Sequence, residues 1–366
     1  MKLRARYSTA TTVLAAALMA YSAGAIAQVN RGNPDERRAQ KAAKAEEQVV
    51  ENFPNATRQS PHQQATKQGG SVLHELVELY QAKNYAETLT KADALLATTD
   101  NAYERSFASQ IAANAAAESG DDAKAVTYFK QAIDANGLDN NDHYVAMYNL
   151  AVTQYKGKQY ADALKTLERL TGETKSDTPE YSALKGTLLA NLDRPLEAAA
   201  LYEQMSARDP ADKKSLMNAV ALYQQAGNFA KADALLAGAK GKGQLTTPDE
   251  YRALYVGYIN AGKLQDAVST IDEGLAKGVV QPSADLVKVY AVIAQTAYGN
   301  SDSKLAIDMY GRAAAISGDG EQGLNLAKVL LNEGRTAEAK KAAQQALDKG
   351  LKNPEEARRI LALGGK

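Results

Sequence analysis

Apolar residues recur every three or four positions along most of this chain, which is the pattern of helices with one buried face. Within that pattern one phrase returns, as in Gly120-Asp-Asp-Ala-Lys-Ala125 and Gly227-Asn-Phe-Ala-Lys-Ala232. Its last alanine has equivalents spaced 33 to 39 residues apart, at Ala125, Ala163, Ala198, Ala232, Ala267, Ala306 and Ala339. A period near 34 residues predicts a stacked array of helix pairs, in which each pair packs on its neighbours.

The array is expected to span residues 71–350. The predicted helix pairs cover roughly 72–97, 103–136, 142–171, 178–209, 213–239, 249–277, 284–316 and 321–349. Thr88 replaces the repeat alanine in the first pair, which is typical of an atypical terminal repeat. Residues 351–366 should hold a last helix, from Pro354 to about Leu363, that caps the array. The pattern therefore predicts an all-α fold, a right-handed α-solenoid of about eight helix pairs with a C-terminal capping helix.

The repeated phrases resemble the tetratricopeptide repeat. That family has small residues at two helix crossings, a small turn residue, an aromatic residue and a final alanine. One repeat matches at Ala113, Gly120, Ala125, Phe129 and Ala132, and another at Ala327, Gly334, Ala339 and Ala346. The family's early tryptophan is missing, since the chain contains no Trp. The resemblance covers about residues 71–350, and it implies a scaffold whose first helices line a concave groove.

The amino terminus has the three parts of a secretory signal peptide. Lys2, Arg4 and Arg6 precede an apolar run over 13–20, and Ala25-Ile26-Ala27 gives the small-x-small pattern before a cleavage site. We expect residues 1–27 to be removed after Ala27 and the chain to be periplasmic. The apolar run is short for a membrane span, so no stable membrane insertion is expected after cleavage. An uncleaved anchor is the alternative.

Residues 28–70 differ from the repeats. Asn33-Pro34-Asp35-Glu36 could open a short helix, but the following stretch to Val50 is polar on nearly every side. Residues 52–70 contain two prolines, two glycines and many polar side chains, which favours a linker. We expect a flexible tail or linker over 28–70; a tether that orders on a partner is the alternative.

Charge and composition exclude several functions. The 43 basic residues balance the 43 acidic ones, which argues against nucleic acid or anionic lipid as the main partner. The chain has no cysteine, so disulfides, thiolate metal sites and a lipid-accepting cysteine are excluded.

Two glycine motifs resemble nucleotide loops only by pattern. Gly318-Asp-Gly320-Glu-Gln-Gly323 follows a predicted helix instead of the strand that a dinucleotide site needs. Gly257-Tyr-Ile-Asn-Ala-Gly262-Lys263 is followed by Leu264 where a phosphate loop has a hydroxyl. The sequence also lacks a zinc-protease motif and a serine-nucleophile elbow. We therefore expect no catalytic residues, no cofactor and no metal, and a protein that is not an enzyme.

The candidate binding residues lie on the first helix of each pair. Tetratricopeptide proteins often use an asparagine at the sixth repeat position to hold a peptide backbone, and an amide suits this because it both donates and accepts. The predicted peptide-binding groove residues are Asn149, Asn218, Asn325, Tyr148, Tyr155, Lys156, Lys214 and Arg252. Leu184 and Ala253 interrupt the asparagines, so no carboxylate clamp is predicted. A structural role for each asparagine, solvated or bonded between repeats, is the alternative.

Together these features predict a periplasmic scaffold that binds a protein or peptide. The phrases Gly274-Leu-Ala-Lys-Gly278 and Ala346-Leu-Asp-Lys-Gly350-Leu-Lys-Asn-Pro354-Glu-Glu-Ala357 resemble periplasmic tetratricopeptide proteins found beside TonB–ExbB–ExbD systems. That resemblance implies an accessory of TonB-dependent outer-membrane transport, with envelope components as partners. The first alternative is an assembly factor for outer-membrane proteins or exported polysaccharide. An enzyme or a carbohydrate-binding protein is the other.

Overall fold

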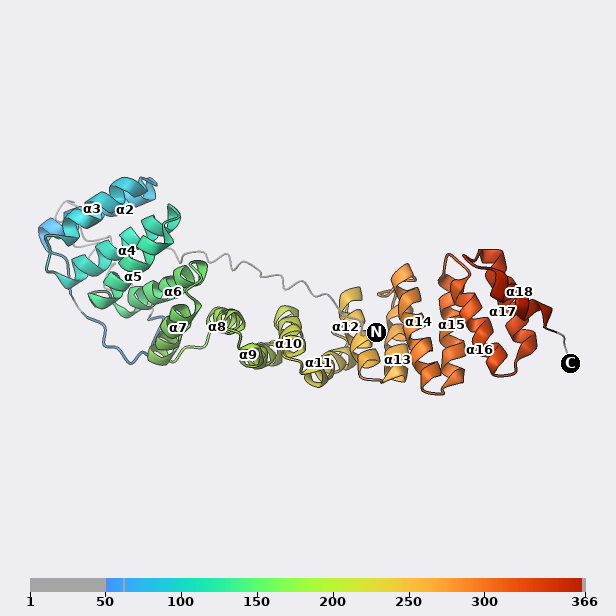
Figure 1. The fold of residues 1–366 in the computed structure, drawn as a ribbon. Coiled ribbons are helices and arrows are strands. Elements are labelled where there is room, and N and C mark those ends of the chain that lie inside the picture. The colour runs from blue at the N-terminus through green and yellow to red at the C-terminus, as the bar shows by residue number, and fades with distance from the viewer. Residues whose placement is uncertain (1–50, 62, 364–366) are drawn as a thin grey trace, which may run out of the picture. The chain divides into compact units, whose positions relative to one another are not determined.

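The computed structural model describes residues 51–61 and 63–363. All regular elements in these ranges are α-helices (Figure 1). The predicted signal peptide (1–27), the part of the tail before residue 51 and its short helix lie outside the described residues. The helices are α2 (Lys67–Gln81), α3 (Tyr85–Leu96), α4 (Ala102–Glu118), α5 (Asp122–Asp134), α6 (Asn140–Lys156), α7 (Tyr160–Thr174), α8 (Pro179–Asn191), α9 (Pro195–Arg208), α10 (Lys213–Gln225), α11 (Phe229–Gly241), α12 (Pro248–Asn260), α13 (Leu264–Ala276), α14 (Ala284–Gly299), α15 (Ser303–Ile316), α16 (Glu321–Asn332), α17 (Thr336–Lys349) and α18 (Glu355–Ala362).

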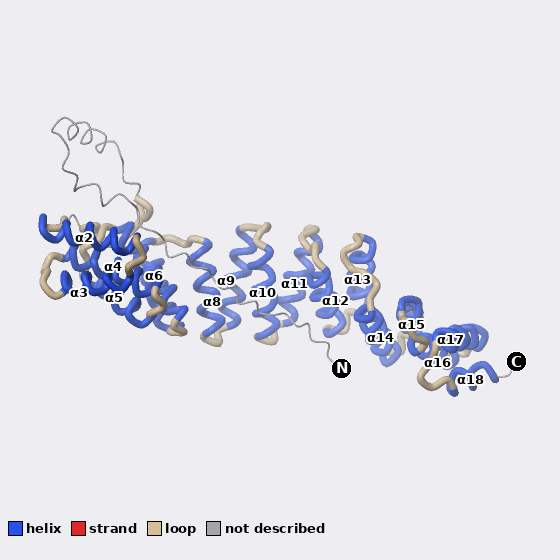
Figure 2. The backbone as a smooth tube through the Cα atoms, turned by 90° about the horizontal axis from the view of Figure 1, so that it is seen from above, coloured by secondary structure: helices blue, strands red, loops and turns tan. Residues whose placement is uncertain are grey.

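The described chain forms two compact units. An N-terminal unit holds α2 to α10, and a C-terminal unit holds α11 to α18, with the boundary between residues 226 and 227. Within each unit successive helices lie side by side and reverse direction at each turn (Figure 2). The predicted all-α array of helix pairs is confirmed, and predicted pairs correspond to pairs of helices. The pair expected over 284–316, for example, is α14 and α15.

The repeat alanines explain why the helices pack as pairs. All seven are completely buried. A side chain of one carbon lets two helix backbones approach, while larger apolar residues three and four positions away fill the space beside the contact. Gly186 of α8 shows how tight such a crossing is, since a Cβ there would lie 2.7 Å from the ring of Tyr202.

The turns between paired helices use the left-handed backbone region. Glycine was predicted there, and Gly120, Gly262 and Gly334 have φ between +73° and +83°. In other pairs the same place holds a residue other than glycine, at Lys83, Lys158, Asp193 and Ser301, with φ between +56° and +63°. The turn geometry is therefore shared, although glycine supplies it in only some of the pairs.

The ends of the array are finished differently. Helix α2 begins at Lys67, four residues before the predicted start of the array, and the Thr66 hydroxyl caps it by accepting from Gly69 N at 3.0 Å. At the other end α18 buries Ala357 and Ile360 against α16 and α17, whereas Glu355 and Arg358 are exposed. A terminal helix with one apolar and one charged face closes the array, as predicted.

None of the helices in the described ranges combines the length and the apolar character that a membrane span requires.

Candidate functional site

Helix α6 carries the first two predicted groove residues. Asn149 is 1% exposed, and its Nδ2 is buried without a hydrogen-bond partner. The neighbouring Tyr148 is also buried, and its ring packs against Tyr181 of α8 with 5.3 Å between the ring centres. Because α6 and α8 are the first helices of successive pairs, this contact lies on the side of the unit that the first helices form. Tyr148 and Asn149 are therefore part of a shared first-helix surface.

The end of α6 is arranged to stabilise its turn. Tyr155 packs against Tyr160 of α7, with ring centres 5.9 Å apart, across the turn that contains the left-handed Lys158. Lys156 is exposed in the last turn of α6, where a cation complements the partial negative charge of the free carbonyls. Both residues thus have structural roles besides the predicted one.

The remaining predicted residues divide between the two units. Asn218 is half-buried and Lys214 exposed on α10, in the N-terminal unit. Arg252 and Asn325 belong to the C-terminal unit, where Arg252 Nη1 lies 3.7 Å from Asp285 Oδ2 and Asn325 Nδ2 donates to Gln322 Oε1 at 3.4 Å. The structure thus gathers Tyr148 and Asn149 on one helix but does not assemble all eight residues.

Buried polar atoms without partners concentrate on α4 and α6. Among the described residues they include Asn114 Oδ1, Ser109 Oγ and both ring nitrogens of His143, in addition to Asn149 Nδ2. A buried polar group that lacks a hydrogen bond lowers stability by about 1–3 kcal/mol, so most such groups in folded proteins are satisfied. Their concentration on α4 and α6 distinguishes these two helices from the other described helices.

The repeat register places Asn114 and Asn149 on the same side of the first helices. Counted back from the equivalent alanines Ala125 and Ala163, Gln110 of α4 corresponds to Tyr148 of α6, and Asn114 corresponds to Val152. We call Gln110, Asn114, Tyr148, Asn149 and Val152 the α4–α6 face. All five are at most 5% exposed and none is charged.

The α4–α6 face differs from its continuation. The equivalents of Gln110 and Asn114 in α8 and α10 are only half-buried. They are Ala183 and Thr187 in α8, and Met217 and Ala221 in α10. The sequence prediction missed Asn114. Its signal was an amide side chain at the position of α4 that is equivalent to Val152 of α6.

Residues 51–66, which we call the edge segment, correct the expectation of a flexible linker over 28–70. Asn52 N donates to Asn141 Oδ1 at 2.9 Å, and the buried Phe53 ring meets Tyr144 edge-on with centres 5.0 Å apart. Thr57 N donates to the last-turn carbonyl of Glu173 in α7 at 2.8 Å. The segment is held by hydrogen bonds and one aromatic residue. Such contacts leave no periodic pattern in the sequence, so the composition favours a linker.

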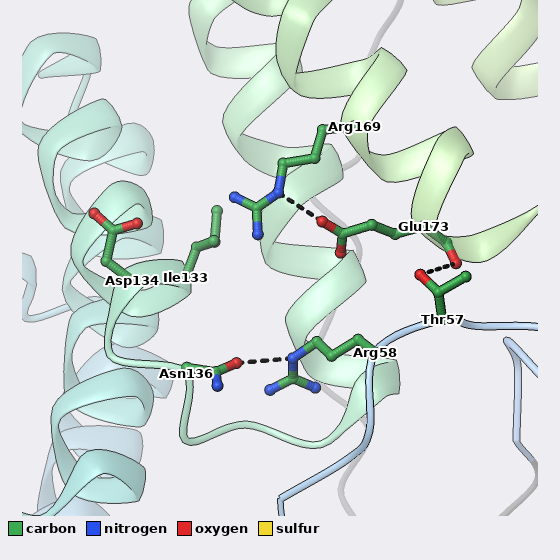
Figure 3. A pocket seen from close by; sticks show the side chains of 7 residues that line it. All are labelled: Thr57, Arg58, Ile133, Asp134, Asn136, Arg169 and Glu173. Atoms are coloured by element: carbon green, nitrogen blue, oxygen red, sulfur yellow. Dashed lines mark hydrogen bonds and ion pairs between the residues drawn. The ribbon is translucent and has the colours of Figure 1, made fainter.

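Arg58 is the main anchor of the edge segment. Its guanidinium donates to Asn136 Oδ1 at 2.8 Å (Figure 3). It also donates to Leu138 O and to Asn140 Oδ1, each at 2.7 Å. Asn140 Nδ2 donates in return to Arg58 O at 3.1 Å. One side chain thus donates to three acceptors in the turn between α5 and α6, and this fixes the edge segment on that turn.

A polar pocket of about 460 Å³ lies beside Arg58, as Figure 3 shows. Arg169 Nε donates to Glu173 Oε1 at 2.7 Å. Two arginines and two carboxylates line the pocket, so its charge is balanced, and Arg58 already makes three hydrogen bonds. The lining residues are Thr57, Arg58, Ile133, Asp134, Asn136, Arg169 and Glu173. The pocket is best explained by the attachment of the edge segment.

Two titratable residues at the start of α6 have shifted pKa values. Burial, with a smaller contribution from the nearby Asp139 carboxylate, raises the pKa of Asp142 to about 7. Burial, followed by the positive charges of Arg58 and Arg169, lowers the pKa of His143 to about 3. His143 is therefore neutral at physiological pH, and the beginning of α6 carries the negative charge of Asp139 with part of that of Asp142.

The C-terminal unit contains the glycine motif that resembled a dinucleotide loop. Gly320 follows α15 and donates from its backbone N to Gly350 O at 2.8 Å, so the motif is a turn between repeats, as expected. A crevice of about 480 Å³ lies here among small residues of α15, α16 and α17, and includes Gly323 and Ala346. Lys349 Nζ, on its border, donates to Ser317 O at 3.2 Å beyond the end of α15.

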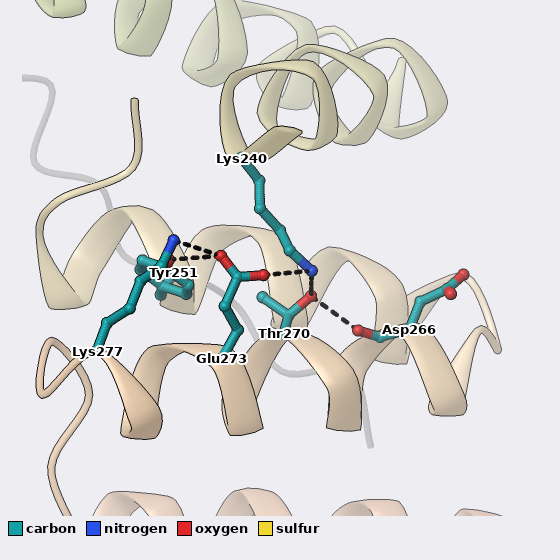
Figure 4. Close-up of polar contacts among 6 residues, drawn as sticks. All are labelled: Lys240, Tyr251, Asp266, Thr270, Glu273 and Lys277. Carbon is teal, nitrogen blue, oxygen red and sulfur yellow. Dashed lines mark hydrogen bonds and ion pairs between the residues drawn. The ribbon is translucent and has the colours of Figure 1, made fainter. Parts of the chain in front are cut away.

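Polar side chains in the C-terminal unit satisfy one another. Glu273 Oε1 accepts from Lys277 Nζ at 2.7 Å and from the Tyr251 hydroxyl at 3.0 Å, and its Oε2 lies 3.3 Å from Lys240 Nζ (Figure 4). Lys240 Nζ also donates to Thr270 Oγ1 at 3.1 Å. This cluster joins α11, α12 and α13, and its role is structural.

No group of three or more His, Cys, Asp or Glu side chains in the described ranges is placed to bind a metal ion.

Comparison with known proteins agrees with the repeat architecture. Residues 116–188 match the family model described as Tetratricopeptide repeat. No curated protein matches the chain in sequence.

Comparison with solved structures gives one match that shows the same fold, and further matches of lower TM-score. The structure of Naa15/Naa10 bound to HypK-THB matches with a TM-score of 0.53 at 14% identity, over 82% of this chain and 45% of that one. This chain thus spans less than half the length of that relative. YrrB, described as a TPR protein with an unusual peptide-binding site, matches at 22% identity over 52% of this chain and 90% of its own, with a TM-score of 0.38. A tetratricopeptide repeat protein from Parabacteroides merdae matches at 14% identity over 71% and 97%, with a TM-score of 0.37.

Proposed function

Because residues 116–188 match the tetratricopeptide repeat model and the helix pairs recur along the described chain, we propose that the protein is a non-catalytic scaffold that binds a protein or peptide on the first-helix surface of its N-terminal unit. The observation that carries the proposal is the α4–α6 face, where Asn149 Nδ2 and Asn114 Oδ1 are buried without partners beside Tyr148. One amide offers a donor and the other an acceptor, as an extended peptide backbone requires.

The chemistry of the face also restricts the partner. It contains no charged residue, so a partner recognised by charge, such as an anionic carboxylate tail, is disfavoured. Tyr148 adds an aromatic surface that remains polar at its hydroxyl, which suits recognition of peptide side chains. An uncharged peptide segment with accessible backbone groups is therefore the best match.

The proposal extends to location and pathway. The signal-peptide pattern of residues 1–27 supports export to the periplasm, and the phrases at 274–278 and 346–357 support a role beside TonB-dependent transport. In that role the N-terminal unit would hold an envelope component while the C-terminal unit completes the scaffold.

The test is crosslinking in living cells, followed by mass spectrometry of the proteins that co-purify with tagged scaffold. We expect TonB-system components, and we expect their loss when Asn149→Ala is combined with Asn218→Ala. Asn325→Ala is the matched control, because it removes an equivalent asparagine from the other unit. Circular dichroism should show that all variants remain folded.

Other outcomes would contradict the proposal at different levels. Recovery of outer-membrane assembly or polysaccharide-export proteins would replace the transport role with an assembly role. Equal recovery with the double variant and with Asn325→Ala would remove the α4–α6 face as the binding site. The absence of any specific protein partner would contradict the scaffold function itself.

A further inference from the structure

The crevice in the C-terminal unit is a gap in an otherwise close-packed array. It has a volume of about 480 Å³ and lies among α15, α16 and α17. Adjacent helices normally fill the space between them, so a gap of this size marks a place where side chains are unusually small. We call it the α15–α17 crevice; its lining includes Ala314, Gly323, Ala342, Gln345 and Lys349.

The repeat register shows which side chain the crevice lacks. The repeat alanine Ala339 lies 72 residues after Ala267, so Gly323 of α16 corresponds to Tyr251 of α12. The repeat between them also has a tyrosine at this position, Tyr290 of α14. Both tyrosines are buried, at 0% and 3% exposed. Two successive repeats thus place a tyrosine ring where the last repeat has only a glycine.

Tyr251 shows how the ring is held in its own repeat. Its hydroxyl donates to Glu273 Oε1 at 3.0 Å and accepts from Lys277 Nζ at 3.2 Å, and that ammonium lies 6.0 Å from the ring centre (Figure 4). Gly274 makes room for the ring, since a Cβ there would lie 3.1 Å from Tyr251 Cδ1. The end of α13 therefore holds both the ring and its hydroxyl.

The last repeat keeps counterparts of these residues although it lacks the tyrosine. By the same count Glu273 and Lys277 correspond to Gln345 and Lys349 of α17, and both of these line the crevice. An amide can accept a hydrogen bond from a phenolic hydroxyl, as a carboxylate does. The crevice thus retains polar groups suited to a tyrosine hydroxyl, while Gly323 supplies no ring.

A second difference opens the crevice on the side of α15. In the earlier repeat Lys240 of α11 covers the cluster, where its Nζ donates to Thr270 Oγ1 at 3.1 Å and lies 3.3 Å from Glu273 Oε2 (Figure 4). Ala314 and Ala342 stand at the positions of Lys240 and Thr270. All lining residues from α15 are glycine or alanine, so a ring from another molecule can enter between α15 and α17.

The charges at the crevice match a neutral occupant. Lys349 Nζ donates to Ser317 O at 3.2 Å, so its charge is directed to the end of α15. Asp348 Oδ1 accepts from Gln344 Nε2 at 2.9 Å. The two charged residues of the lining therefore have partners within the described chain. The exposed Gln345 amide is the polar group that remains for a hydroxyl.

From this comparison of repeats we propose that the α15–α17 crevice binds a tyrosine side chain of a partner protein, in the place that Tyr251 and Tyr290 fill within their own repeats. The ring packs on the small residues of the lining, and its hydroxyl pairs with Gln345. One anchored aromatic side chain often supplies much of the affinity of a protein interface. The site belongs to the C-terminal unit and is therefore additional to the α4–α6 face.

Titration with short peptides tests the site. The chain from Gln28, labelled at its alanine methyl groups, is titrated with peptides that carry Tyr, Phe or Leu between glycines. An aromatic ring in the crevice should shift the methyl resonances of Ala314, Ala342 and Ala346 upfield, as seen by NMR. We expect the Tyr peptide to bind about tenfold more tightly than the Leu peptide and about threefold more tightly than the Phe peptide.

Variants of the lining locate the binding. Ala314→Leu fills the crevice and should weaken the Tyr peptide about tenfold, whereas Ala337→Leu, at an exposed α17 position outside the lining, is the matched control and should not. Gln345→Ala should remove the preference for Tyr over Phe without weakening the Phe peptide. Circular dichroism checks that each variant is folded, and Ala315→Leu, at an exposed lining position, replaces Ala314→Leu if that variant unfolds.

Three results would overturn the proposal. Equal affinity for the Tyr and Leu peptides would mean that the crevice does not select a ring. Equal weakening by Ala314→Leu and Ala337→Leu would place the peptide elsewhere. Tighter binding of free p-cresol than of the Tyr peptide would identify a small phenol, instead of a protein side chain, as the ligand. None of these measurements involves the α4–α6 face or its partner, so the inference stands or fails separately from the proposed function.

Discussion

Two polar sites, one in each unit, differ in how fully their hydrogen bonds are satisfied. In the C-terminal unit Glu273 is surrounded by two lysines and a tyrosine hydroxyl that satisfy its carboxylate. In the N-terminal unit Asn114 and Asn149 are buried with an atom each unpartnered. Both units have the same repeat architecture, so the difference does not follow from the fold. A polar group satisfied by its neighbours contributes to stability, whereas a buried one left unsatisfied lowers it until a hydrogen-bonding partner is supplied.

Asp233 is the exception that sharpens this contrast. It lies on α11 in the C-terminal unit, packed against Gly257 of α12, and its Oδ1 is buried without a partner. Burial raises the pKa of Asp233. A carboxyl group can lessen the penalty of burial by taking up a proton, and an amide has no such route. The unsatisfied amides of the α4–α6 face therefore remain the stronger evidence for a partner.

The largest effect should follow removal of Arg58. Arg58→Ala deletes three hydrogen bonds and leaves Leu138 O and Asn140 Oδ1 without their donor. We expect the free energy of unfolding of the N-terminal unit to fall by about 3 kcal/mol, measured by urea denaturation. Arg169 lines the same pocket, but Arg169→Ala removes only one exposed ion pair, with Glu173. This variant should lower the free energy of unfolding by less than about 1 kcal/mol. Equal losses would show that the edge segment contributes little.

The next effect depends on pH. Because the pKa of Asp142 is raised to about 7, from about 3.9 in the unfolded chain, the folded state binds more protons between these values. Stability should therefore fall as pH rises from about 4 to 7. Asp142→Asn should flatten this part of the profile and raise the free energy of unfolding at pH 8 by about 1–2 kcal/mol.

Urea unfolding at several pH values checks this expectation. Asp121→Asn is the control, because a backbone hydrogen bond from Lys124 lowers the pKa of Asp121 instead. That carboxylate stabilises the fold above its ordinary pKa, and its contribution is lost as pH falls. An unchanged slope in Asp142→Asn would show that Asp142 titrates normally.

A smaller effect is expected at the satisfied cluster of the C-terminal unit. Hydrogen bonding from Lys277 lowers the pKa of Glu273, so the carboxylate stabilises the fold above about pH 4.3 and the contribution is lost at lower pH. Since the site is partly exposed, Glu273→Gln should lower the free energy of unfolding by only about 1 kcal/mol at pH 7. Glu338→Gln, which loses an exposed pair with Arg335, should produce no measurable change. If Glu273→Gln and Glu338→Gln lower the free energy of unfolding equally, the cluster around Glu273 stabilises the fold no more than an exposed ion pair does.

The smallest effect should come from the α4–α6 face. Asn149→Leu replaces an amide whose Nδ2 has no partner, so the free energy of unfolding should fall by no more than about 0.5 kcal/mol. Asn140→Leu, which breaks bonds to Arg58 in both directions, should lower it by about 2 kcal/mol. If Asn149→Leu is as damaging as Asn140→Leu, the Asn149 amide is satisfied in the folded protein and the contrast between the units fails.

The sequence could predict the array because its information is periodic. Small residues such as Ala198 must recur wherever helices cross, and the turns must reach the left-handed region at a fixed place, so both leave a repeating signal. The register also placed Tyr148 and Asn149 on the first-helix surface. Periodicity could not reveal which amides lack partners, because that depends on the neighbours of each residue.

The edge segment escaped prediction for a related reason. Its contacts join Thr57 to Glu173 and Arg58 to the turn before α6, over separations of about 80 to 116 residues, without a repeat or an apolar face. Only Phe53 stood out from a polar background. Its two prolines favour a linker, although such a segment can equally be fixed by hydrogen bonds to helix ends.

The edge segment has a consequence for how the protein folds. A simple helical array can form from any repeat and grow outward, because each repeat interacts only with its neighbours. The edge segment connects the ends of α4, α6 and α7, so these helices cannot separate one at a time without breaking contacts between distant parts of the chain. The first repeats should therefore unfold as one cooperative block, while α16 to α18 lose structure gradually from their end. Closing so large a loop is slow, so the docking of residues 51–66 should be a late event, after the helices that they join have paired.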